Sequence, residues 1–134
     1  MSWNEYEIID ARREIHDAAQ AMLAGRLSYI EGARKIVAAK SLARLDEWDP
    51  DLLPFEGIDS ETDALPLGVM RAHWQAAALE SLQPEIDRLE VWARQLGEPY
   101  CRNLVGRFSG GQIMPAIGPS GSLIATDNVF KVED

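Results

Sequence analysis

The first forty residues carry apolar side chains at helical spacing in two consecutive stretches. Ser2 and Glu5 have the spacing of a capping box, and Gly25 is placed to end the helix that follows. The pattern resumes at Ser28 and Glu31. Helices joined by about three residues fold back on one another, so we predict an antiparallel hairpin. Its expected apolar faces are Ile8, Ala11, Ile15, Ala18, Ala19, Met22 and Leu23, and then Tyr29, Ile30, Ala33, Ile36 and Val37.

Three further helical stretches are predicted in the second half of the chain. They run from Val69 to Leu82, from Pro84 to Gly97 and from Pro99 to Phe108. Each proline is assigned to the first turn of its helix, where a missing N–H costs nothing. A length of 134 residues fits one domain. We therefore predict a mainly α fold, a single-domain bundle of about five helices over residues 1–108.

Residues 109–134 differ in composition from the rest. They are rich in glycine, and β-branched residues lie around Asp127 and Asn128. This pattern is compatible with a short β-hairpin or with an irregular arm. We treat the segment as a C-terminal extension of the helical domain.

A proline-punctuated acidic segment, residues 46–68, lies between the second and third predicted helices. The formal net charge of the chain is −9, and residues 46–63 contain eight carboxylates and no Lys or Arg, so the remainder carries only −1. The prolines and glycines predict a long loop. Large apolar residues in the same segment predict that the loop is anchored on the helices with its carboxylates facing water.

An acidic surface of this kind favours a basic protein as partner and argues against direct contact with nucleic acid. Trp48 and Phe55 lie among the carboxylates, where each either anchors the loop or packs against the partner. The candidate partner-binding residues are Asp46, Glu47, Trp48, Asp49, Asp51, Phe55, Glu56, Asp59, Glu61 and Asp63.

Enzymatic alternatives have less support in the sequence. Asp59, Glu61 and Asp63 alternate as in the opening of a calcium loop, but the glycine and the final bidentate carboxylate of that motif are missing. A metal-dependent hydrolase would combine these three carboxylates with His73. No phosphate-binding loop, nucleophile elbow or dinucleotide motif is found. We expect no catalytic residue, no metal and no cofactor; a structural, self-associating helical protein is the other alternative.

A single cysteine, Cys101, leaves the chain without an internal disulfide, and its apolar neighbours predict burial. Trp74 and Trp92 are also predicted to lie in the core. No secretory signal and no apolar run of about 20 residues is present, so we predict a cytoplasmic protein that does not enter membranes.

Three segments carry a resemblance: SYIEGARKIVAAK, DPDLLPFEGIDSETDALPLG and VMRAHW. They resemble small bacterial helical proteins with a GIDSETDALPLG-type motif, which are associated with toxin neutralisation. The resemblance covers roughly residues 1–108. It implies a cytoplasmic immunity protein that binds one cognate toxin, such as a nuclease-type toxin whose basic cleft the acidic side chains would enter. It implies no catalytic residues.

Overall fold

The computed structural model describes residues 3–66 and 68–110, and within these ranges the fold is mainly α, with no strand. The predicted mainly α, single-domain fold is confirmed, with four α-helices and one 3-10 helix in the described residues. The C-terminal hairpin or arm lies outside the described residues. None of the described helices is long and apolar enough to cross a membrane. The elements are α1 (Trp3–Leu23), α2 (Tyr29–Lys40), α3 (Leu53–Thr62), η1 (Gly68–His73) and α4 (Ala76–Gly110).

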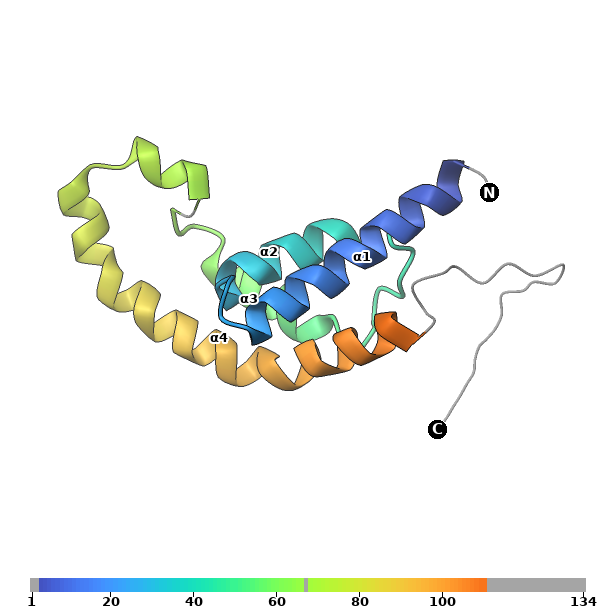
Figure 1. The fold of residues 1–134 in the computed structure, drawn as a ribbon. Coiled ribbons are helices and arrows are strands. Elements are labelled where there is room, and N and C mark those ends of the chain that lie inside the picture. The colour runs from blue at the N-terminus through green and yellow to red at the C-terminus, as the bar shows by residue number, and fades with distance from the viewer. Residues whose placement is uncertain (1–2, 67, 111–134) are drawn as a thin grey trace, which may run out of the picture.

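Helices α1 and α2 form the predicted antiparallel hairpin (Figure 1). Ser28 is the N-cap of α2, where its Oγ accepts a hydrogen bond from the backbone N–H of Glu31 at 3.0 Å. Gly25 ends α1 with a φ of 79°, a left-handed conformation that glycine adopts without steric cost. The predicted cap at Ser2 lies outside the described residues.

The core lies where α3 and α4 cover the hairpin (Figure 1). Ile15 of α1, Ile36 of α2 and Phe55 of α3 have no exposed surface. Gly32 allows α2 to approach α1 closely, because an added Cβ would lie 2.2 Å from the Sδ of Met22. Burial of these large apolar groups supplies the main favourable term for folding.

The prediction of an uninterrupted loop over residues 46–68 is wrong, because α3 occupies its centre. Pro54 stands in the first turn of α3, where a proline is tolerated, and Gly57 has open space around it. Phe55, Ile58 and Thr62 repeat at helical spacing and are buried. The anchoring of this segment is confirmed for Leu52, Phe55 and Ile58, which are part of the core. It is not found for Leu53 and Trp48, which are 38% and 70% exposed.

The three helices predicted after residue 68 are also revised. The first is split into η1 and the start of α4, and α4 then continues through Pro84, Gly97 and Pro99 without ending. Both prolines are exposed on α4, so water can reach the carbonyl groups left without an N–H donor. Figure 1 shows that α4 curves around the bundle.

Two of the three residues predicted to be buried in these helices are partly exposed. Trp74 is 40% exposed and Trp92 is 37% exposed, so the prediction that they lie in the core is wrong. Cys101 has no exposed surface, which confirms its predicted burial. Gly97 is buried as well, against Tyr29, Phe55 and Ile58.

The packing at Gly97 gives a test of this arrangement. A Cβ at position 97 would lie 3.0 Å from Phe55 Cε1 and 3.3 Å from Tyr29 Cδ2, so the methyl groups of Gly97→Val would have to displace core rings. We expect the free energy of unfolding to fall by about 2 kcal/mol, measured by urea denaturation. Gly106→Val on the same helix is the control, because no atom lies within 4 Å of its added Cβ. Equal losses in the two variants would contradict the close packing of α4 on α3.

Candidate functional site

The acidic segment begins with a buried carboxylate. Asp49 is 5% exposed, and its two oxygens accept hydrogen bonds from Nη1 and Nη2 of Arg107 at 2.9 and 2.6 Å. Arg107 Nη1 also donates to Asp51 at 3.0 Å. Asn103 donates to the other oxygen of Asp51 at 3.0 Å. The last turns of α4 thus hold the connector between α2 and α3 through a bidentate ion pair.

Electrostatics around Arg107 follow from its burial and its partners. Burial by itself lowers the pKa of Arg107, but the hydrogen bonds and charge of Asp49, with a further contribution from Asp51, raise this pKa above its ordinary value. Burial lowers the pKa of Arg12, and the positive charge of Arg107 lowers it further. The Nε of Arg12 donates to the carbonyl of Ala43 at 2.9 Å, so α1 also holds the connector.

Two more of the candidate carboxylates are paired with cations of α2. Glu56 accepts a hydrogen bond from Lys40. The Nε of Arg34 lies 3.8 Å from a carboxylate oxygen of Asp59. The Nη2 of Arg34 donates hydrogen bonds to the carbonyl groups of Thr62, the last residue of α3, and of Leu65 just beyond it. The guanidinium therefore interacts with the negative end of the α3 dipole as well as with a carboxylate.

The prediction that this segment turns its carboxylates to water is consequently wrong for half of them. Asp49, Asp51, Glu56 and Asp59 are neutralised by cations of the protein itself. Phe55 has no exposed surface, so this structure does not present it to a partner. The pairing could not be read from the sequence because Arg107 follows Asp49 by 58 residues.

Five candidate residues remain exposed, in two groups. Asp46, Glu47 and Trp48 lie in the connector before α3, whereas Glu61 and Asp63 lie at the end of α3. Trp48 is 70% exposed, more than any other large apolar residue in the described part of the chain. We call Asp46, Glu47 and Trp48 the Trp48 edge.

Hydrogen bonds fix the backbone of the Trp48 edge. The N–H of Trp48 donates to Oδ1 of Asp46 at 3.1 Å, and Lys40 Nζ donates to the carbonyl of Glu47 at 2.9 Å. The next residue, Asp49, is held by Arg107. Neither carboxylate of the edge has an ion pair with a described residue.

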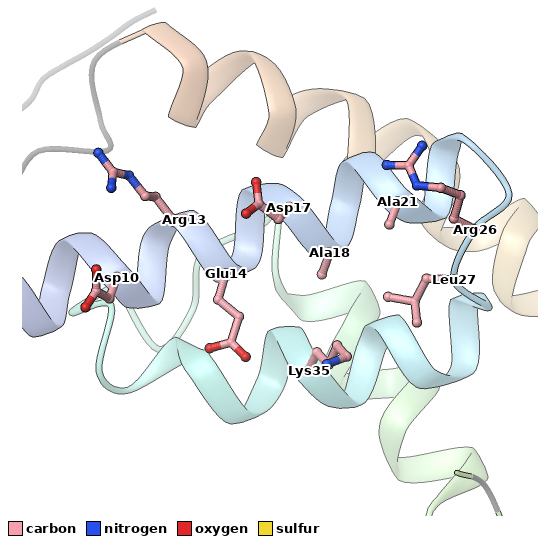
Figure 2. Close-up of a pocket in the computed structure, with 9 residues that line it drawn as sticks. All are labelled: Asp10, Arg13, Glu14, Asp17, Ala18, Ala21, Arg26, Leu27 and Lys35. Atoms are coloured by element: carbon pink, nitrogen blue, oxygen red, sulfur yellow. The ribbon is translucent and has the colours of Figure 1, made fainter.

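A groove of about 600 Å³ lies between α1 and α2 (Figure 2). Glu14 extends from α1 towards α2, where Lys35 lies, and Arg13 and Arg26 stand near opposite ends. Small side chains line part of it, and charges of both signs surround it. The groove contains no assembled acid–base pair or nucleophile. Its lining residues are Asp10, Arg13, Glu14, Asp17, Ala18, Ala21, Arg26, Leu27 and Lys35.

Hydrolytic chemistry finds little support in the geometry. Among residues 3–66 and 68–110, no group of three His, Cys, Asp or Glu could hold a metal ion, so Asp59, Glu61, Asp63 and His73 do not assemble as one site. His16 bridges α1 and α4, with Nδ1 3.0 Å from Asp17 and Nε2 3.0 Å from Ser109 Oγ.

The carboxylate of Asp17, the imidazole of His16 and the hydroxyl of Ser109 follow one another in the order of a nucleophilic triad. The Asp17 side chain is 75% exposed, however, so water screens its charge from the imidazole. In protease triads the corresponding Asp is buried against its His. We interpret the network as a polar link between α1 and the end of α4.

The N-terminus of α2 is another polar site that the sequence did not reveal. The carboxylate of Glu90 accepts hydrogen bonds from the N–H groups of Tyr29 at 2.7 Å and Ile30 at 3.2 Å. A helix N-terminus attracts anions, and here a carboxylate from α4 already satisfies it. The pairing across 61 residues connects the hairpin with the middle of α4.

Loss of the Asp49 side chain tests the connector geometry. Asp49→Ala removes the bidentate partner of the buried Arg107 and leaves Asp51 as its ion-pair partner among the described residues, so we expect the free energy of unfolding to fall by about 3 kcal/mol. Asp63→Ala, at an exposed aspartate, is the control. In a double-mutant cycle, adding Arg107→Ala to Asp49→Ala should cost much less than Arg107→Ala alone. Additive losses in urea denaturation would show that the pair is not coupled.

Burial also makes Cys101 and Tyr29 sensitive to high pH. Burial raises the pKa of Cys101 to about 12 from 9.0, and the pKa of Tyr29 to about 12 from 10.0. The unfolded chain ionises first, so both contributions are present below pH 9.0 and are lost as the pH rises towards about 12. We expect stability to fall across this range in urea denaturation, and to fall less in Cys101→Ala. An identical decline in the variant would contradict the burial of the thiol.

Comparison with family models, curated proteins and solved structures gives no match for this chain. The resemblance to toxin-neutralising proteins therefore rests on the three segments quoted from the sequence. The surface features above carry the functional argument.

Proposed function

We propose that this chain is a partner-binding protein that docks a basic protein through the Trp48 edge. The observation that carries this proposal is an indole that is 70% exposed on a connector held in place by buried ion pairs. Tryptophan is among the residues most enriched at the energetic centres of protein interfaces. Its exposure leaves a large apolar area in water that a partner's pocket would cover.

The fixed backbone lowers the entropic cost of docking. A tryptophan on a flexible loop would have to be ordered on binding, and that cost would reduce the affinity. Here Lys40 binds the carbonyl of Glu47, and Arg107 binds Asp49 on the other side of Trp48. The side chain is therefore presented from a backbone that is already ordered.

Charge defines the class of partner. Asp46 and Glu47, the two residues that precede Trp48 in the connector, are both exposed. Two unpaired carboxylates beside an apolar anchor fit a partner pocket with a basic rim, and they accelerate the encounter with a cationic surface. Leu42, 54% exposed in the same connector, offers further apolar area.

Neutralisation of a toxin is the specific form of this role that we propose. Its support is the resemblance of the three quoted segments to immunity proteins, together with the negative charge of the chain, −9. A nuclease-type toxin has a basic cleft for phosphates, and exposed carboxylates can occupy such a cleft. The proposal retains Asp46, Glu47 and Trp48 from the ten binding residues expected from the sequence.

The test compares two exposed tryptophans. With the chain as bait, the basic protein retained from native cells is identified, purified and titrated in a calorimeter. We expect Trp48→Ala to weaken binding by about 2 kcal/mol or more, roughly 30-fold in Kd. The control is Trp74→Ala, which removes a tryptophan that follows α3 in the sequence and is 40% exposed. This variant should leave the Kd unchanged.

A double variant separates the contribution of charge to binding from that of apolar packing. Asp46→Asn with Glu47→Gln should slow association and flatten its dependence on salt, with little change in dissociation. Equal binding by Trp48→Ala and the parent chain would remove the Trp48 edge as the interface. Failure to retain any basic protein would remove the proposed class of partner.

A further inference from the structure

Helix α4 carries a second apolar stripe beside the face that packs on the bundle. Leu82, Leu89 and Leu96 recur every seven residues. Ala78 lies four residues before Leu82, and Trp92 lies three residues after Leu89, so these residues follow the spacing of a heptad repeat. Glu85 occupies the remaining position of this series. We call these six residues the α4 seam.

The α4 seam is distinct from the buried face of the helix. Ile86, Ala93 and Leu104 point into the core, whereas the seam lies roughly a quarter of a turn away at 100° per residue. Trp92 is 37% exposed and Leu96 is 36% exposed, whereas Leu82 and Leu89, at the edge of the seam nearest the core, are partly buried and pack against it. A helix with two apolar faces has room for two neighbours, and in the described residues only one of those faces is fully covered.

The beginning of α4 is weakly covered by the rest of the bundle, although Leu82 packs against the core. No side chain from Met70 to Glu85 is buried, and Figure 1 shows this part of the chain extending beyond the α1–α2 hairpin. Most of the stability of a helix in a protein comes from packing of its apolar face, and the first turns of α4 have little such packing. A neighbouring helix on the α4 seam would stabilise this segment and cover its leucines.

We propose that the α4 seam binds the α4 seam of a second copy of this chain in an antiparallel, two-fold symmetric pair. In the register centred on Asp87, Leu82 lies opposite Trp92 of the second copy, and Leu89 lies opposite Glu85 of the second copy. Two-fold symmetry produces each of these layers twice.

Charge complementarity selects the second copy and its direction. In this register Glu85 lies within one residue of Arg88 of the second copy, so two Glu85–Arg88 ion pairs form across the interface. Both residues are exposed, and neither has an ion pair among the described residues. A parallel pair in register would instead place the two Glu85 side chains together, which is unfavourable.

The first test is the mass of the full-length chain in sedimentation equilibrium over the micromolar range. We expect a dimer that dissociates in Trp92→Glu and persists in Val91→Glu. Val91 is the matched control because it is an adjacent apolar residue, 57% exposed, on the opposite side of α4 from the seam. A monomeric parent chain, or equal dissociation of both variants, would overturn the proposal.

A charge exchange tests the antiparallel register. Glu85→Arg and Arg88→Glu each replace two attractive pairs with two repulsive ones, so each should raise the dimer Kd about tenfold. An equimolar mixture of these two variants restores both attractive pairs and should dimerise as tightly as the parent chain. Failure of the mixture to recover would overturn the register. Far-UV circular dichroism of each variant checks that α4 remains folded.

Discussion

The bidentate ion pair between Arg107 and Asp49 is the interaction on which the arrangement of the acidic segment depends. It joins the end of α4 to the connector that precedes α3, and Asp51 and Asn103 extend the same contact. A buried ion pair adds little stability relative to apolar packing, because desolvation offsets most of the attraction. Its geometry nevertheless determines which way the connector runs. With Asp49 held inside, the neighbouring Trp48 is left outside.

The same interaction explains why a strongly acidic segment is not a uniformly acidic surface. Arg34, Lys40 and Arg107 neutralise four of its eight carboxylates from helices that lie before and after it in the chain. The repulsion expected among closely spaced like charges is relieved inside the protein. The charge that stays exposed is concentrated at the Trp48 edge and at the end of α3, so the segment presents two small acidic areas in place of one.

The hairpin and the burial of Cys101 could be predicted from the sequence because capping and periodicity are local signals. The later helices could not, because Pro84, Gly97 and Pro99 have the same local signature whether a helix ends there or continues. Only the tertiary structure shows that both prolines are exposed and that the ring of Phe55 packs against Gly97. Within the candidate site, the exposure of Trp48 and the burial of Phe55 were undecided for the same reason. Trp48 and Phe55 have similar neighbours in the sequence, but Asp49, next to Trp48, is held by Arg107, whereas Phe55 packs against Gly97 in the core.

The contact between the carboxylate of Glu90 and the start of α2 affects how the protein folds while it is being synthesised. The hairpin is synthesised first, yet the N–H groups of Tyr29 and Ile30 receive their acceptor only from Glu90, which follows them by 61 and 60 residues. On the ribosome, the nascent hairpin therefore exposes its apolar side and has an incompletely satisfied helix terminus until α4 emerges. Completion of this part of the fold awaits translation of α4, and shorter nascent chains are the ones that chaperones and proteases would encounter in an open state.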